Sequence, residues 1–570
     1  MEDNGYFIKT LFRKHSLLNV SALLISVLGP AIATMLAGSF VGSQGLAVIA
    51  ICAPLFLAAS FFGFTIAGGG QIVCSAFVAK DSPEDVNEVF NASLFLMLAM
   101  AVITIVMMSV FKEPLLLFLA GEITRDLSAF YDFYLPYVFF SMLIYVPLYF
   151  SKTAGRVGVG LVLMASMAAV SSISGMLFVR TMGIEGIALG LSMGSFVGFV
   201  VGMGLLSKHY KIKLPRQLYV KRIFVSGSPA GLSRLYIFIV TITLNTMFLR
   251  AGGIDALAVF GVVSVIHRFA LAVIVGIVQT ILPLIGVFQE EQDYTSIRQT
   301  MKLAFVSGNI VMTVFGALIV LFNPFWSVAF GLPAGGGLTF VMIFYTAYLV
   351  MLFNGALLSA YYNASKRIAL ANAIPFLQEF ATIGITAVVL GSALGLVGIW
   401  AAFPVSGAVS LMALFVYLLV ARGKELSVPL LQNRAVEAEG RFMSFSVESG
   451  INKASEASVK TNDYCLKHGI PSKQSMLISM SVEEIVTLII NNNKTKNLSV
   501  SVRLVLFSDR IVLRIRNTGE RFDVIEYYGS NIACDSEKSL EVIGMKYIVQ
   551  AARNIYYRRT FGVNSLVVVI

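Results

Sequence analysis

Long apolar stretches dominate the first three quarters of the chain. No charged residue occurs in 16–79, in 303–365 or in 380–421. A helix needs about 20 apolar residues to cross the ~30 Å hydrocarbon layer of a membrane, so each stretch has room for two or three crossings. The backbone there must be helical, because unpaired peptide groups in lipid are costly.

Turn residues and isolated charges divide the apolar region into twelve expected spans. Their approximate limits are 17–39, 46–74, 88–111, 129–151, 157–179, 186–207, 224–249, 256–287, 299–322, 336–362, 369–391 and 395–420. The expected fold class is therefore a polytopic all-α membrane protein, embedded in a lipid bilayer. The apolar run after the first sixteen residues is too long for a cleavable signal.

The last part of the chain has a different pattern. Residues 1–423 contain 39 charged side chains, whereas the 147 residues after them contain 34. Helical periodicity is expected at 451–468, 472–492 and 538–552. "LSVSVRLVLF", "RIVLRIRNTG" and "SLVVVI" alternate as half-buried strands do, with a turn at Ser508-Asp509-Arg510. We expect an α+β sandwich, with helices covering one face of a mixed sheet.

Basic residues in the loops predict the orientation. With the N-terminus in the cytoplasm, the inner segments hold 17 Lys and Arg and the outer loops 4. The positive-inside rule then places both termini and the C-terminal domain in the cytoplasm of a multi-pass plasma-membrane protein. The net charge of +11 thus reflects topology, and no nucleic-acid partner is expected.

A repeat divides the membrane region in two. "GLAVIAICAPLF" at Gly45 and "ALAVFGVVSVIH" at Ala256 occupy equivalent places, 211 residues apart. Two parallel six-helix lobes are expected, since an even number of spans gives both the same orientation. The expected domains are an N-terminal lobe at 1–210, a C-terminal lobe at 211–423 and the cytoplasmic domain at 424–570.

The paired motifs resemble those of the multidrug and toxic compound extrusion (MATE) family. "GPAIATMLAGSFVGSQGLAVIAICAPL" and "AGGGQIVCSAFVAKDSPED" carry the likeness in the first half, and "GIDALAVFGVVSVIHRFALAVIVGIVQTILPLIG" in the second. The resemblance implies cation-coupled antiport or efflux of organic, often cationic, compounds. Pro30 matches a proline that bends the first span in many members, and proline alone predicts a kink there. Ala37 stands where many prokaryotic members carry an aspartate.

Ionisable side chains in the predicted spans are candidates for ion coupling, because charges inside lipid are rare unless they are functional. Arg234 lies in the seventh span, His267 and Arg268 in the eighth, and Glu379 in the eleventh. Glu379 is the candidate proton or sodium site. Alternatively, Glu379 and Arg268 form a buried ion pair that only fixes packing. The polar companions in these spans are Asn245, Gln279, Asn354 and Gln378.

The C-terminal domain resembles the histidine kinase-like ATPase (GHKL) superfamily, most closely its anti-sigma-factor kinase branch. "SVEEIVTLIIN", "RIRNTGERFDVIEYY" and "LEVIGMKYIVQAARNIYYRRTFGVNSLVVVI" occur in the order of its N, G1 and G2 boxes. In that superfamily a glutamate polarises the attacking group and an asparagine one turn later holds magnesium. A G1-box aspartate contacts adenine, and glycines let the phosphate loop close.

Two of the polar anchors that this resemblance implies are changed. Glu484 takes the glutamate position, but Leu488 stands one turn later, and a leucine cannot bind magnesium. Asn517 replaces the G1-box aspartate. Catalysis is therefore not expected, and Glu484 could equally be a solvated helix residue. The candidate nucleotide-contacting residues are Glu484, Asn491, Asn517, Gly519, Gly544 and Ser565.

The expected function is secondary active transport with a degenerate nucleotide-binding-like regulatory domain. The partners are a small organic substrate, a coupling proton or sodium ion and a cytoplasmic regulatory protein, and ATP is the candidate cofactor. The alternative is a membrane-anchored signalling protein of the anti-sigma-factor kinase type that uses the lobes as a sensor. No metal site is expected, because Cys52, Cys74, Cys465 and Cys534 form no metal-binding spacing.

Overall fold

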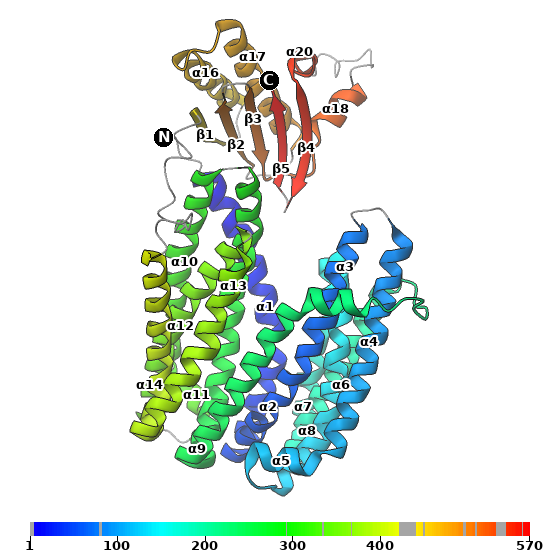
Figure 1. Ribbon diagram of the computed structural model, residues 1–570, viewed down its shortest axis with the longest axis vertical. Coiled ribbons are helices and arrows are strands. Elements are labelled where there is room, and N and C mark those ends of the chain that lie inside the picture. Colours follow the sequence, from blue (N-terminus) through cyan, green and yellow to red (C-terminus); the bar gives the residue numbers. More distant parts are fainter. Residues whose placement is uncertain are drawn as a thin grey trace.

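The structure is a computed structural model (Figure 1). It describes residues 5–78, 82–154, 156–291, 293–332, 336–365, 367–420, 441–448, 451–493, 498–507, 510–531, 543–560 and 563–570. Cys534, the turn residues Ser508 and Asp509, and the boundary predicted near residue 423 lie outside these ranges.

The membrane part consists of long apolar helices. The first are α1 (Gly5–Val41), α2 (Ser43–Phe62), η1 (Gly63–Gly68), α3 (Gly69–Val78), α4 (Pro83–Val110), α5 (Lys112–Ala120), α6 (Arg125–Thr153), α7 (Val157–Met182) and α8 (Ile184–Leu206). Then follow α9 (Val220–Glu290), α10 (Tyr294–Leu321), α11 (Asn323–Ala329), α12 (Gly336–Ala364), α13 (Ile368–Pro375), η2 (Phe376–Ala381) and α14 (Thr382–Val420). Within the described ranges, ten helical segments are long and apolar enough to cross a membrane.

Two of these segments are broken by a glycine, and the breaks repeat along the chain. Gly253 interrupts α9 with φ 66° and ψ −157°, and Gly42, which lies 211 residues earlier, ends α1 with φ 83° and ψ −157°. Gly395 interrupts α14 with φ 60° and ψ −138°, and Gly183 has nearly the same angles 212 residues earlier. Side chains cannot adopt this backbone conformation without strain. The two halves of the membrane region therefore turn at equivalent places, as the sequence repeat predicts.

Helices α1–α8, here called the N-terminal bundle, lie beside α9–α14, the C-terminal bundle (Figure 1). Small residues let the two backbones touch. A Cβ on Gly227 of α9 would lie 1.9 Å from the carbonyl oxygen of Thr65 in η1, and a Cβ on Gly38 of α1 would lie 2.0 Å from that of Phe330. Close approach of this kind is how membrane helices associate, because lipid provides no hydrophobic driving force.

The C-terminal part, here called the sheet domain (residues 441–570), contains five strands and four described helices. The strands are β1 (Arg441–Glu448), β2 (Ser499–Leu506), β3 (Ile511–Asn517), β4 (Asn554–Thr560) and β5 (Val563–Val569). The helices are α16 (Ile451–Lys467), α17 (Ser472–Asn491), α18 (Val524–Asn531) and α20 (Ile543–Ala551). The strand order is β1-β2-β3-β5-β4 and every pairing is antiparallel, so the prediction of a mixed sheet is wrong.

One face of the sheet is apolar and the other is basic. Val500, Val502 and Leu504 of β2 are fully buried in a core with Val482 and Ile485 of α17. The alternate positions of the strands carry Ser501 and Arg503, which pair with Arg516 and Arg514 of β3. Helices α16, α17 and α20 cover the apolar face, and the membrane helices lie below the sheet (Figure 1).

Candidate functional site

The first candidate site lies where the two bundles meet, around Arg234 of α9. The guanidinium carbon of Arg234 lies 4.0 Å from the ring centroid of Phe64 in η1, a cation–π contact. The Phe64 ring in turn contacts Tyr145 and Tyr149 of α6, at centroid distances of 5.3 and 6.1 Å. Arg234 therefore reaches from the C-terminal bundle into an aromatic cluster of the N-terminal bundle.

Glu379 lies on the other side of Arg234. It belongs to η2, and Arg234 is the charged residue that acts on its carboxylate. Tyr236 of α9 packs on Phe376 and Phe380 of the same π-helical turn, at 5.2 and 5.1 Å. Neighbouring residues of α9 thus contact both π-helical turns, one in each bundle. Such turns often occur at functional sites.

The predicted pairing of Glu379 with Arg268 is not found. Arg268 acts on Tyr134 and Tyr137 of α6, while His267 packs its ring edge-on against Tyr345 at 6.0 Å. The His267 Nδ1 atom is buried without a hydrogen-bond partner. The sequence placed Arg234 and Arg268 in neighbouring spans, but only the fold decides which of them faces the eleventh span.

The polar companions are dispersed. The Asn245 amide donates to the Ala50 carbonyl at 2.7 Å and so joins α9 to α2. Asn354 exchanges hydrogen bonds with Asn309 of α10 at 2.9 and 3.1 Å. Gln378 is buried and donates to the Met351 carbonyl at 2.9 Å, while Gln279 is exposed. These residues tie helices together and do not surround Glu379.

The second candidate site is in the sheet domain, around Glu484 of α17. Glu484 accepts a hydrogen bond from the backbone N–H of Gly544, and a Cβ on Gly544 would lie 2.4 Å from the Glu484 carboxyl carbon. Burial raises the pKa of Glu484 above its ordinary value, although the Gly544 N–H opposes the shift. Leu488 is buried among core residues. The carboxylate is therefore held by α20, with an apolar residue one turn further along.

Asn517 belongs to the same face of the domain. Its side-chain oxygen accepts from the Gly519 N–H at 3.1 Å and from the Asn564 amide at 2.8 Å. Asn491 is exposed at the end of α17. The predicted role of Ser565 needs correction, since adjacent strand residues point to opposite faces and it is Asn564 that meets Asn517. Ser565 lies on the basic face and lines a cavity against the membrane helices.

The third arrangement is an ion-pair cluster between the sheet domain and the membrane helices. The carboxylate of Asp293, between α9 and α10, lies 2.6 Å from Arg503 Nη1 and 3.0 Å from Arg516 Nη1. Glu291 pairs with Arg516, and with Arg514 at 3.4 Å. Asp293 also caps α10, accepting from the backbone N–H and hydroxyl of Ser296 at 3.1 and 2.9 Å.

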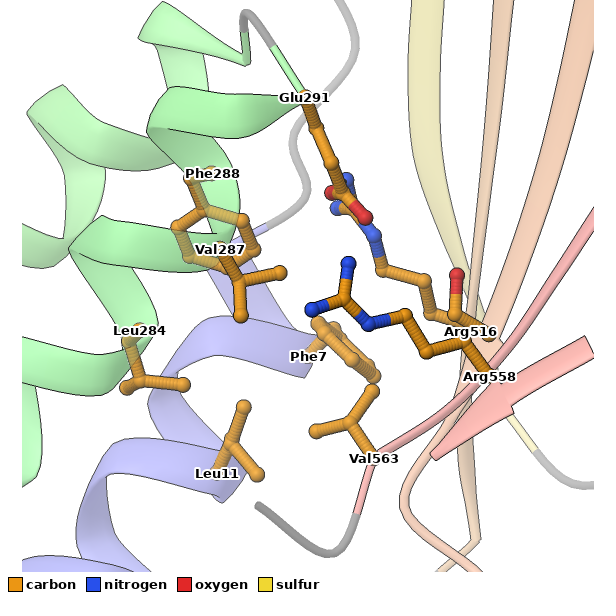
Figure 2. Close-up of a pocket in the computed structure, with 10 residues that line it drawn as sticks. Phe7, Leu11, Leu284, Val287, Phe288, Glu291, Arg516, Arg558 and Val563 are labelled. Carbon is orange, nitrogen blue, oxygen red and sulfur yellow. The ribbon is translucent and has the colours of Figure 1, made fainter. Parts of the chain in front are cut away.

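Apolar contacts surround this ion-pair cluster. Phe7 and Leu11 of α1 and Phe288 of α9 lie against Val563 and the arginines (Figure 2). The Arg516 guanidinium lies 5.0 Å from the Phe288 ring centroid. Burial would raise the pKa of Asp293, but Arg503, Arg516 and the Ser296 hydrogen bonds outweigh burial and hold that pKa below its ordinary value. The cluster therefore stays charged and attaches the sheet domain to α1 and α9.

Sequence reasoning missed this cluster. Arg503, Arg514 and Arg516 occupy the outward positions of two alternating strands, so a basic row on the sheet was readable from the sequence. Its acidic partners were not, because Glu291 and Asp293 resemble ordinary loop charges until the fold brings them together. The aromatic partners of Arg234 were missed for the same reason.

Comparisons with known proteins agree on the membrane part. The MatE family model matches residues 20–174. An inward-facing multidrug resistance MATE family transporter of the MOP superfamily matches with a TM-score of 0.62 at 17% identity, covering 72% of this chain and 100% of its own. An outward-facing one gives 0.58 at 18% identity, covering 73% and 97%. The MATE multidrug transporter DinF-BH gives 0.59 at 21% identity, covering 74% and 98%. No curated protein matches.

These likenesses define the class of protein. The membrane part has the fold of MATE transporters, and the matched family model supports the same assignment for its first spans.

Proposed function

We propose that the protein is a secondary active transporter that exports small organic compounds across the plasma membrane. The observation that carries this proposal is the MATE fold with the Arg234–Glu379 site at the junction of its bundles. Structures of MATE transporters include one in complex with the compound MaD3S, which supports a small organic substrate. Counting each glycine-broken helix as two gives the twelve crossings of the proposed topology.

Both termini are proposed to lie in the cytoplasm. The loop charges support this orientation, because inner segments carry 17 basic residues and outer loops 4. The sheet domain and the start of α1 lie at the same end of the bundles (Figure 1). That end therefore faces the cytoplasm in the proposed topology.

Glu379 is the proposed coupling site for a proton or sodium ion. It is the one acidic side chain between residues 294 and 423, and residues 16–79 contain none. Its place in a π-helical turn beside a cation favours a functional role over a purely structural one. Binding of the ion would change the charge that faces Arg234, and this change links the two bundles.

The sheet domain is proposed to regulate transport from its docked position. Its likeness to GHKL domains supports a degenerate nucleotide-binding role, since Leu488 cannot supply a magnesium ligand. Docking through Asp293 gives the domain a direct contact with the first turn of α10. A nucleotide or a cytoplasmic protein that alters this contact would alter the helices that move during transport.

Transport into inverted membrane vesicles tests the proposal. A panel of organic cations, anions and neutral compounds is offered to vesicles that contain the protein, with and without a proton or sodium gradient. Gradient-dependent accumulation of at least one compound, absent from vesicles without the protein, is expected. Accumulation of none would contradict the proposal.

A further inference from the structure

The junction of the bundles carries more positive than negative charge. Arg234 lies over Phe64, and the ammonium of Lys152 lies 5.3 Å from the ring centroid of Tyr149 in the same aromatic cluster. Glu379 is the one acid that the structure shows acting on Arg234. Two cations thus share one aromatic cluster, with one carboxylate on its far side.

Arg234 is also poorly satisfied. Its Nε atom is buried without a hydrogen-bond partner, and among the described residues no carboxylate lies within 4.0 Å of its guanidinium. Arginine carries five N–H donors in a planar fork that matches a carboxylate or a sulfonate. A buried donor without a partner is unfavourable, so an anionic group placed here would gain a contact that the protein lacks.

The surrounding rings favour an aromatic ligand. Phe64, Tyr145 and Tyr149 are each partly exposed, and their centroids lie 5.3 to 6.4 Å apart. The rings can stack on a flat apolar body, and the two tyrosine hydroxyls can donate to an acidic group. A cationic ligand would instead approach Arg234 and Lys152, whose charges repel it in a medium of low dielectric constant.

We propose that this junction binds aromatic organic anions, with Arg234 pairing with the acidic group and Phe64 and Tyr149 stacking on the ring system. The proposal rests on the proposed transport function and names its substrate class. It differs from the organic cations that resemblance to the MATE family suggests.

Binding to the purified full-length protein in lipid nanodiscs tests the substrate class. Naphthoate and naphthamidine have the same ring system and opposite charges, and calorimetry compares them directly. Naphthoate is expected to bind more tightly. Arg234→Gln should weaken naphthoate binding at least about tenfold, as loss of a charge-assisted hydrogen bond implies. Arg234→Lys should retain part of the affinity, and Lys152→Gln should also weaken binding.

Arg180 provides a matched control. It lies over Phe40 at 6.0 Å and is exposed, so Arg180→Gln removes the same kind of contact elsewhere. Tighter binding of naphthamidine, no binding of naphthoate, or equal effects of the Arg234 and Arg180 substitutions would overturn the proposal. Gradient-driven transport of cations alone would overturn the anion assignment and leave the transport function standing. Lys152→Gln replaces an exposed side chain and keeps the test valid if Arg234→Gln does not fold.

Discussion

The Arg503 Nη1 atom lies 2.6 Å from the Asp293 Oδ1 atom, and both side chains are buried although 210 residues separate them. Removing one partner of a buried pair is strongly unfavourable, by about 3–5 kcal/mol, because the other charge stays buried. Asp293→Asn should therefore release the sheet domain from the membrane helices. Spin labels at the exposed positions Val459 and Ile310 would report this as a longer and broader distance distribution.

The exposed pair of Lys112 and Asp132 is the control for this experiment. These side chains are also 2.6 Å apart, but their exposed fractions are 26% and 55%. An exposed pair contributes about 1 kcal/mol or less. Asp132→Asn should leave the label distances unchanged, and an Asp293→Asn protein with native distances would show that apolar contacts alone hold the domain.

Docking should resist mild acid. The pKa of Asp293 lies below its ordinary value in the docked state, so its stabilising effect is complete above the ordinary aspartate pKa of about 3.9. It is lost as the pH falls through the depressed docked-state pKa. The same label distances should stay constant between about pH 5 and 8 and lengthen only below about pH 4. Undocking near neutral pH would mean that another group controls the contact.

Ion coupling should depend on Glu379. Glu379→Gln removes the ionisable group but preserves its size, so the protein should fold and lose the proton or sodium dependence of transport. Uptake into vesicles at varied pH and sodium concentration measures this. Asp132→Asn, which removes an acid from α6 on the other bundle, should leave the dependence intact. Unchanged coupling in Glu379→Gln would reduce Glu379 to a packing residue.

The unaltered sheet domain should bind ATP weakly and with little magnesium dependence. Leu488 occupies the position of the metal ligand and Glu484 is engaged by Gly544. Leu488→Asn combined with Asn517→Asp should increase magnesium-dependent affinity at least about tenfold, because a hydrogen bond to a charged group contributes about 1.5–3 kcal/mol. Calorimetry on the full-length protein measures it. Tight magnesium-dependent binding by the unaltered protein, abolished by Asn491→Ala, would show that Asn491 supplies the ligand.

The contact between Gly38 and the turn after α11 should control how far the bundles separate. A Cβ at Gly38 would lie 2.0 Å from the Phe330 carbonyl oxygen, which is backbone and cannot easily move away. Gly38→Ala should force the bundles apart there and lengthen the distance between spin labels at the exposed positions Val110 and Val328. Gly384→Ala, where the added carbon meets open space, should not change it.

Much of the fold was predictable because membrane and sheet patterns are local. The absence of charge between Ser16 and Ala79 requires helices, and the repeat at Gly45 and Ala256 predicts the matched halves. Helices α16 and α17 begin at the expected residues, 451 and 472. Strands β1 and β4 and helix α18 were missed, because "RFMSFSVE" and "NIYYRRT" have too few regularly spaced apolar residues to mark a strand.

The site was less predictable, because it depends on which helix faces which. Arg234 and Arg268 both lie in spans of the second half, and their sequence positions do not decide which of them approaches Glu379. The pairing of Ser565 failed by one residue, since a strand reverses its face at every position and Asn564 is the residue that meets Asn517.

The position of Asp293 also has a consequence for biosynthesis. The ribosome makes Asp293 210 residues before Arg503. At about 5–20 residues per second, that distance corresponds to ~10–40 s of synthesis. During this interval the carboxylate has only Ser296 and water as partners, at a helix start that must already be seated in the membrane. The last strands to be made therefore complete a membrane surface laid down much earlier, and a nascent chain that stops before β2 leaves that surface unfinished.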